Sequence, residues 1–242
     1  MGIELPTEIV LASEVNPRFL ILYGKPKSGK TQLIAGLPNT LTIDLENGTD
    51  YFNMMKIKAS NLSELGEIRR ALAAQPDLYD QIVIDTGTKL EEMVMPLAVS
   101  MYKKLPIAKK YTGDDLRTLP QGAGYLYIRE AYKQVINNFR AVSKRLILIC
   151  HLKDKYVEKE GEELVSMELD LTGKLKSIIS AEADAIGYVY RMGKDASQTW
   201  VSFITQENII CGARPQHLKN KSFIMLDSKD GQFNYYWDKI YI

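Results

Sequence analysis

A short segment near the start of the chain carries the residue types of a phosphate-binding loop. Residues 24–31 read glycine, four further residues, and then Gly-Lys-Thr. In such a loop the glycines let backbone N–H groups converge on a phosphate, the lysine reaches the β and γ oxygens, and the threonine hydroxyl takes one Mg²⁺ position. The sequence therefore predicts ATP and Mg²⁺ as ligands. The predicted nucleotide-binding residues are Gly24, Lys25, Pro26, Lys27, Ser28, Gly29, Lys30, Thr31 and Gln32.

The flanking residues distinguish this motif from a chance surface turn rich in glycine and lysine. An apolar run at 19–23 precedes it, and a run typical of a helix follows at 31–35. A phosphate-binding loop joins a strand to a helix, so this is the context that the motif requires. We therefore expect Lys30 to contact the phosphates and Thr31 to hold the metal.

Two acidic residues are candidates for the remaining chemistry. Asp85 ends an apolar run and predicts the second Mg²⁺ contact; an aspartate there could also cap a helix, alone or in addition to that role. The next residue is Thr86, where many ATPase motors place the glutamate that orients water. The water-polarising acid must then lie elsewhere, and Glu46 is the best-placed candidate. The alternative is that Glu46 is a solvated loop residue.

Strand and helix patterns alternate over the first 150 residues, which is typical of a parallel sheet. The expected strands are 40–45, 79–85 and 145–150, and the expected helices are 61–75, 86–102 and 125–143. After a polar stretch at 152–176, expected to be a loop, β-rich runs without intervening helices predict hairpins that turn at 193–195 and 229–231. The prediction is an α/β fold with a mainly parallel central sheet, flanking helices and C-terminal antiparallel hairpins.

The chain shows no linker, so we expect one domain over residues 1–242. Its parts would be an N-terminal arm (1–17), an ATPase core (18–226) and a C-terminal strand (227–242).

Composition limits the possible partners and the compartment. The chain has 31 basic and 30 acidic residues, so its net charge neither demands nor excludes nucleic acid, and any surface for a polyanion must be local. Cys150 and Cys211 have no metal-ligand spacing and form no disulfide framework, which suits a reducing cytoplasm. No apolar run approaches the roughly 18 residues of a membrane span. We expect a cytoplasmic protein that does not bind membranes.

Four segments together resemble the RecA family of ATPases. Residues 43–50 resemble its second-strand motif, in which the glutamate, here Glu46, is the catalytic carboxylate. Residues 84–86 resemble its Walker B motif, and 148–151 resemble its sensor strand, which ends in histidine in several relatives, including hexameric helicases. Residues 218–221 resemble its lysine pair that reaches the neighbouring subunit's γ-phosphate. The chain is most similar to the short, core-only RecA-like proteins of bacteriophages, of the single-strand annealing type.

The resemblance implies roles for three further residues. His151 would sense the γ-phosphate and pass its state to residues 152–176, whereas a lone histidine is ordinarily structural. Lys219 and Lys221 would act in trans, so that hydrolysis requires a homo-oligomer, either a ring or a filament. Two residues apart on an extended segment, these lysines would point the same way. The alternative is an ordinary basic turn.

The resemblance also places two loops against single-stranded DNA, at about 103–124 and 152–176. The second is also rich in acids, and the alternative for both is a solvated surface loop. Tyr102 and Tyr111 accompany the first loop, and lysines with an occasional aromatic suit a site that follows the backbone and stacks bases. The predicted DNA-binding residues are Lys103, Lys104, Lys109, Lys110, Lys153 and Lys155.

Three peripheral features complete the expectations. Tyr51 follows the Glu46 motif and would stack on adenine. Residues 3–12 would dock on a neighbouring subunit. The aromatic C-terminal strand around Trp237 either stacks bases or packs on the sheet.

These features predict an ATP-dependent, single-stranded DNA-binding protein that promotes strand annealing or homologous recombination. It would be phage-encoded, would meet a single-strand DNA-binding protein, and would hydrolyse ATP slowly with stimulation by assembly and DNA. One alternative is a hexameric helicase-like motor or helicase loader. Another is a nucleotide or small-molecule kinase, although the chain's scattered arginines do not suggest the arginine-rich lid of such enzymes.

Overall fold

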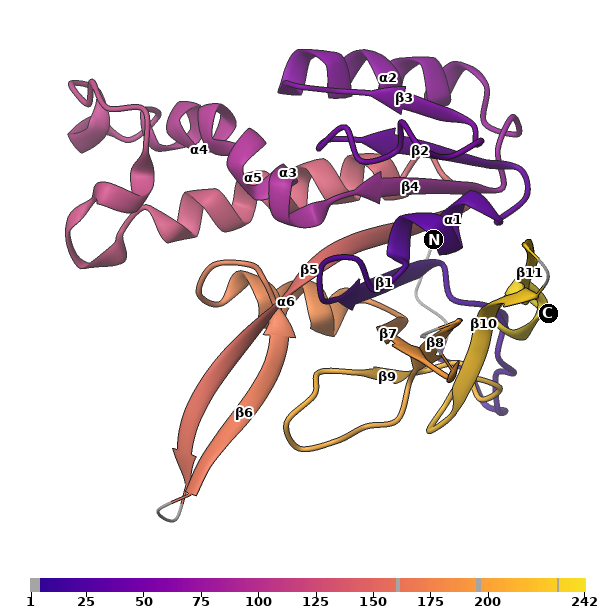
Figure 1. The fold of residues 1–242 in the computed structure, drawn as a ribbon. Coiled ribbons are helices and arrows are strands. Elements are labelled where there is room, and N and C mark those ends of the chain that lie inside the picture. Colours follow the sequence, from indigo (N-terminus) through magenta and orange to yellow (C-terminus); the bar gives the residue numbers. More distant parts are fainter. Residues whose placement is uncertain (1–4, 160–161, 195–196, 230) are drawn as a thin grey trace.

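A single mixed sheet organises the chain (Figure 1). The computed structural model describes residues 5–159, 162–194, 197–229 and 231–242. The strands are β1 (Phe19–Gly24), β2 (Thr40–Asp44), β3 (Lys56–Lys58), β4 (Gln81–Asp85), β5 (Arg145–Lys159), β6 (Glu162–Leu169), β7 (Ala185–Met192), β8 (Gln198–Ser202), β9 (Gly212–Ala213), β10 (Ser222–Lys229) and β11 (Gln232–Tyr235). Along the sheet the order is β11-β10-β8-β7-β1-β5-β4-β2-β3, with β6 paired to β5 and β9 paired to β7.

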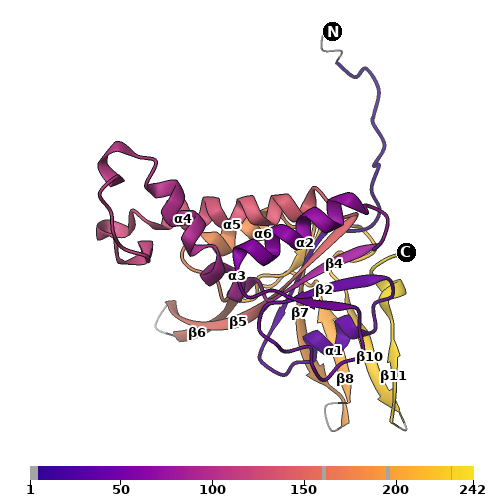
Figure 2. The ribbon, with the colours of Figure 1, turned by 90° about the horizontal axis from the view of Figure 1, so that it is seen from above.

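In the described part of the chain, six α-helices cover the sheet. They are α1 (Lys30–Ala35), α2 (Leu62–Ala74), α3 (Gly87–Met93), α4 (Met95–Tyr102), α5 (Tyr125–Arg140) and α6 (Leu175–Glu182). In Figure 2, α2 to α6 lie on one side of the sheet and α1 lies on the other, beside the C-terminal strands. Asn61 caps α2, because its side chain accepts a hydrogen bond from the Glu64 N–H.

The central strands are apolar on consecutive residues because both of their faces are buried. In β1, Phe19 and Ile21 pack in the core under α2 to α6, whereas Leu20 and Leu22 pack in the core under α1. Strand β1 pairs in parallel with β5 and β7, and β4 pairs in parallel with β2 and β5. The carboxyl ends of these strands therefore meet at one edge of the sheet.

The C-terminal part is antiparallel. Strand β7 pairs with β8, β8 with β10, and β10 with β11. The predicted α/β class, with its mainly parallel sheet and antiparallel C-terminal hairpins, is confirmed. The expected turns fall between these paired strands, and residues 195 and 230 of those turns lie outside the described part of the chain. Trp237 is buried and donates its indole N–H to the Leu33 carbonyl, so it packs on α1.

The expected loop at 152–176 is wrong. Strand β5 continues through His151 to Lys159 and forms an antiparallel hairpin with β6, and α6 begins at Leu175. The hairpin projects from the body (Figure 1), and Lys153, Asp154, Lys155 and Tyr156 of β5 are exposed. Cross-strand pairs such as Lys153 opposite Glu168 stabilise such a ribbon.

The described N-terminal residues extend away from the body (Figure 2). The segment 5–15 is exposed, including the apolar side chains of Leu5, Ile9 and Leu11. Ile3, part of the predicted docking segment, lies outside the described residues. The body begins at Asn16, whose side chain bonds the backbone of Ile242. Among the described helices, none is long and apolar enough to cross a membrane.

Candidate nucleotide-binding site

The loop between β1 and α1 has the conformation that its glycines require. Gly29 has a φ of 94°, which favours glycine. A side chain at Gly24 would place its Cβ 2.3 Å from the carbonyl oxygen of Val189 in β7. The Lys30 ammonium donates to the Gly24 and Lys25 carbonyls, each at 2.8 Å. The loop is therefore closed around its lysine.

The buried ammonium of Lys30 favours binding of an anion. Lys30 is 6% exposed, and burial lowers the pKa of its ammonium while nearby Asp85 partly opposes this shift. A buried cation is costly unless it is paired. A phosphate would supply that pairing.

The two predicted Mg²⁺ ligands lie together. The Thr31 hydroxyl donates to Asp85 Oδ2 at 3.0 Å. Burial raises the pKa of Asp85 to about 6, although the Thr31 hydrogen bond acts in the opposite direction. A bound cation would favour the ionised carboxylate, and these are oxygen donors of the kind that Mg²⁺ prefers. The residues present therefore fit the metal. The alternative role of Asp85 as a helix cap is wrong, because Thr86 caps α3.

Glu46 faces the same site and is held by two groups. The Thr86 hydroxyl donates to Glu46 Oε1 at 2.7 Å, and His151 Nε2 lies 3.3 and 3.1 Å from the two carboxylate oxygens. The hydrogen bond from His151 lowers the pKa of Glu46, and Glu46 in turn raises the pKa of His151. The structure thus brings Glu46 and His151 together, as predicted residues of one site. It adds Thr86, which the sequence analysis noted only because many ATPase motors have a glutamate at that position.

Asp44 holds the turn that presents Glu46. It is 2% exposed and accepts four hydrogen bonds. The donors are the N–H groups of Glu46 at 3.0 Å, Gly48 at 3.3 Å and Thr49 at 3.0 Å, and the Thr49 hydroxyl at 2.6 Å. Burial opposes ionisation, yet these bonds keep the pKa of Asp44 below its ordinary value. An aspartate at a strand end before a Gly-Thr pair is a signal for such a turn, and it could have identified Asp44.

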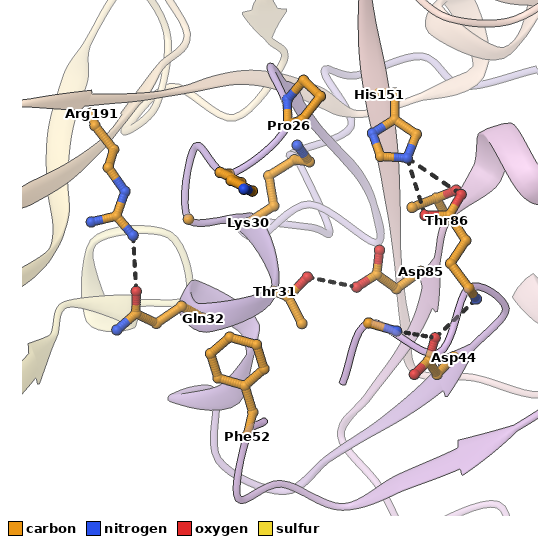
Figure 3. Close-up of a pocket in the computed structure, with 14 residues that line it drawn as sticks. Pro26, Lys30, Thr31, Gln32, Asp44, Phe52, Asp85, Thr86, His151 and Arg191 are labelled. Atoms are coloured by element: carbon orange, nitrogen blue, oxygen red, sulfur yellow. Dashed lines mark hydrogen bonds and ion pairs between the residues drawn. The ribbon is translucent and has the colours of Figure 1, made fainter. Parts of the chain in front are cut away.

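One cavity of about 380 Å³ joins these groups (Figure 3). It is lined by Pro26, Lys27, Gly29, Lys30, Thr31, Gln32, Asp44, Glu46, Gly48, Phe52, Asp85, Thr86, His151 and Arg191. Phe52 and Arg191 were not predicted. Tyr51 was predicted to stack on adenine, but its side chain is 93% exposed and does not line the cavity. In the turn after Thr49, the adjacent residue Phe52 faces inward instead.

The predicted trans-acting lysines lie outside this cavity. Lys219 and Lys221 are exposed. Their segment is a turn and is not extended, because the Leu218 N–H bonds the Pro215 carbonyl, the Lys221 N–H bonds the Leu218 carbonyl, and Asn220 has a φ of 55°. The expectation that both lysines point the same way on an extended segment is therefore wrong. Their action on a neighbouring subunit stays a prediction.

The predicted DNA-binding lysines are on the surface. Lys103, Lys104, Lys109 and Lys110 are exposed around the short 3-10 helix at Pro106–Ala108. Lys153 and Lys155 are exposed on the β5–β6 hairpin. The 103–124 segment and the hairpin both project from the side where the parallel strands end (Figures 1 and 2).

The tyrosines of the first loop take part in packing. The rings of Tyr102 and Tyr111 meet edge to face at 5.4 Å, and the Tyr111 hydroxyl donates to the Asp115 carbonyl. They are engaged within the protein and do not form an open platform for bases.

Comparisons with known proteins give a family and structural neighbours. Two solved structures resemble the chain, each at 12% identity over 90% of it: the RadB recombinase, covered to 91% with a TM-score of 0.47, and a KaiC-like protein from the hyperthermophilic archaeon Pyrococcus horikoshii OT3, covered to 89% with a TM-score of 0.48. A comparison with curated protein sequences gave no match. The model of the AAA domain matches residues 16–232, and the chain belongs to this family.

Proposed function

We propose that the protein is a Mg²⁺-dependent ATPase. The observation that carries this proposal is the convergence of Lys30, Thr31, Asp85 and Glu46 on one cavity. A phosphate-binding lysine, an oxygen pair suited to Mg²⁺ and a carboxylate at the adjacent strand end are the groups that phosphoryl transfer to water requires. Membership of the AAA domain family supports nucleotide binding.

In the proposed reaction, Glu46 orients a water molecule and accepts its proton as the oxygen attacks the γ-phosphorus, and the products are ADP and inorganic phosphate. Lys30 neutralises the transferred phosphoryl group. Thr31 and Asp85 would hold Mg²⁺, and the bound ion would offset the negative charge of the phosphates. Glu46 is hydrogen-bonded to Thr86 and His151, so its carboxylate is already ionised and fixed in direction.

We assign the sensor role to His151. Its ring bonds Glu46, and the same strand continues into the β5–β6 hairpin. A γ-phosphate that drew His151 away from Glu46 would move the first residues of the hairpin. This would couple nucleotide state to the residues that carry Lys153 and Lys155.

We assign single-stranded DNA as the macromolecular ligand, and strand annealing or homologous recombination in a phage-encoded protein as the role. The exposed lysines of the 103–124 segment and of the hairpin supply charge that follows a phosphate backbone. Both segments project from the side where nucleotide would bind, which supports coupling between the two ligands (Figure 1). A single-strand DNA-binding protein is the expected partner on DNA.

We further assign a homo-oligomer as the active state. The apolar side chains of Leu5, Ile9 and Leu11 are more than four-fifths exposed on a segment that leaves the body. Burial of such side chains against a second copy would stabilise an assembly. Lys219 and Lys221 are exposed and lie outside their own cavity, which leaves them able to reach a neighbour's.

A hexameric helicase-like motor or helicase loader is the second candidate. The contact between His151 and Glu46 favours it equally, since a histidine sensor suits both classes. ATP-driven separation of a duplex with a single-stranded tail would decide for the motor, whereas annealing without unwinding would decide for the recombination role.

The ATPase assignment predicts different effects for two variants. Lys30→Ala should lose ATP binding, because the buried ammonium is removed. Glu46→Gln should bind ATP but release phosphate at least about 100-fold more slowly, because the amide does not accept the proton of water. Phosphate release with and without single-stranded DNA, together with ATP affinity, checks both. Glu67→Gln, an exposed change on α2, should behave as wild type; normal turnover by Glu46→Gln would contradict the assignment.

Asp44→Asn should lower kcat about tenfold and leave KM within about threefold. Asparagine keeps one acceptor oxygen and sets an amide N–H₂ against backbone donors, so the turn that directs Glu46 loosens while the phosphate loop stays intact. Steady-state ATP hydrolysis gives both constants. Asp50→Asn, which breaks only an exposed pair with Lys58, is the matched control. A rise in KM without loss of kcat would show that Asp44 does not position Glu46.

Replacing Lys103, Lys104, Lys109 and Lys110 together with glutamine should weaken binding of single-stranded DNA. The slope of log affinity against log salt should fall by up to about 0.7 per lost phosphate contact. Fluorescence anisotropy with a labelled oligonucleotide measures both quantities. A Lys194→Gln and Lys229→Gln variant, changed at exposed C-terminal positions, should keep the wild-type slope. If all three proteins share one slope, the first-loop site does not exist.

Removal of residues 1–15 should reduce the particle mass to that of a monomer and lower the ATPase rate, because both the docking side chains and the trans lysines of a neighbour would be lost. Light scattering after size exclusion measures the mass. The truncated protein should still bind ATP, since Asn16 and the body remain. An unchanged oligomer would exclude the arm as the connection.

A further inference from the structure

The antiparallel part of the sheet forms one wall of the phosphate-binding loop. Beyond the contact of Gly24 with Val189, a Cβ at Gly29 would lie 2.7 Å from the Thr199 hydroxyl of β8 and 3.2 Å from Nη2 of Arg191 in β7. Thr199 is fully buried there. The side chains of β7 and β8 are thus packed directly on the loop backbone.

Arg191 reaches from this wall into the cavity. Its guanidinium Nη2 donates to Gln32 Oε1 at 3.0 Å, and Gln32 lies in the first turn of α1. Figure 3 shows Arg191 and Gln32 on one side of Lys30 and Thr31, and His151 and Thr86 on the other. The cavity therefore has an arginine end and an acid end, with the phosphate-loop lysine between them.

The balance between positive and negative side chains in the cavity depends on this arginine. The cations are Lys27, Lys30 and Arg191, and the acids are Asp44, Glu46 and Asp85. Without Arg191, the lining would carry one more acid than cation, which opposes entry of a polyanion. Arg191 is also the only arginine among the described residues that line the cavity.

We propose that Arg191 binds the α-phosphate of the nucleotide, and that Arg191, Gln32 and Phe52 form the nucleoside end of the site. This inference rests on the proposed ATPase. The γ-phosphate must lie near Glu46, and the β-phosphate belongs in the loop at Lys30, so the α-phosphate is directed toward Gln32 and Arg191. A planar guanidinium fits two non-bridging oxygens of one phosphate. Phe52, which lies below Gln32 and Thr31 in Figure 3, offers an apolar ring to the base.

The test compares ATP with ADP, because both contain the α-phosphate and only ATP contains the γ-phosphate. Calorimetry without DNA should show that Arg191→Gln weakens the affinity for both nucleotides about tenfold. Arg191→Lys should weaken both about threefold, because lysine keeps a charge and loses the two-pronged hydrogen bond. Arg70→Gln, an exposed arginine of α2, should leave both affinities unchanged.

Two results would overturn the inference: affinities within twofold of wild type for both nucleotides, or a loss confined to ATP, which would place the guanidinium at the γ-phosphate. Thermal unfolding without nucleotide checks the fold of Arg191→Gln. If that variant is destabilised, Arg191→Lys decides, and equal losses for ATP and ADP support the inference while unchanged affinities refute it. Wild-type protein that bound neither nucleotide would refute the ATPase proposal itself, whereas equal binding by wild type and Arg191→Gln would refute only the role of Arg191.

Discussion

The parallel register of β1, β2, β4 and β5 is the constraint on which the site depends. In that register Asp44 lies opposite Asp85, and Gly24 lies opposite His151. Gly24, Asp85 and His151 each follow a run of buried apolar side chains, and Asp44 ends a buried strand, so burial keeps these strands in the core and carries their polar ends to one edge. A shift of one residue in any of these strands would move its terminal polar group away from that edge and separate the acids from the lysine.

This arrangement concentrates charge in a partly dry place. Burial raises the pKa of Asp85, and the acidic neighbours Asp44 and Glu46 raise it further. The hydrogen bond from Thr31 and the charge of Lys30 act in the opposite direction. Lys30 in turn is disfavoured as an ammonium by burial. Such groups gain most from ligands of opposite charge, and clustered pKa shifts of this kind are typical of functional sites. A metal and a phosphate would stabilise the folded protein through the same contacts that serve the proposed reaction.

Sequence reasoning identified the parts of the site whose signal is local. The phosphate loop is contiguous, and Asp85 and His151 end apolar strands, so their place at the sheet edge follows from the pattern. Arg191 could not be found in this way, because its contact with Gln32 joins residues 159 positions apart and depends on the pairing of β7 with β1. The choice of Phe52 over Tyr51 depends on one turn, whose direction is set by Asp44.

The β5–β6 hairpin shows a different limit. Hydrophobic periodicity indicates burial, and residues 153–156 of β5 are exposed, so the lysines and acids of this ribbon were assigned to a loop. The turn at Lys219 and Lys221 is a related case, because a positive φ at Asn220 reverses the chain where an extended segment was assumed. In both regions the residue types indicated that the segment is exposed, but they did not indicate the path of the backbone.

The two ends of the cavity belong to different parts of the fold, and this has a consequence for coupling. At the acid end, Thr86 begins α3, and Glu91 in the same helix accepts a hydrogen bond from the Thr172 N–H, just beyond β6. His151 lies within β5, at the last residue that pairs with β1 before the strand continues into the hairpin. The acid end is therefore connected to both strands of the hairpin. The arginine end is instead part of the antiparallel sheet through β7. In the proposed ATPase, loss of the γ-phosphate would release the hairpin while the α-phosphate still bound Arg191 of β7, so ADP would hold the antiparallel sheet in place and free only the β5–β6 hairpin.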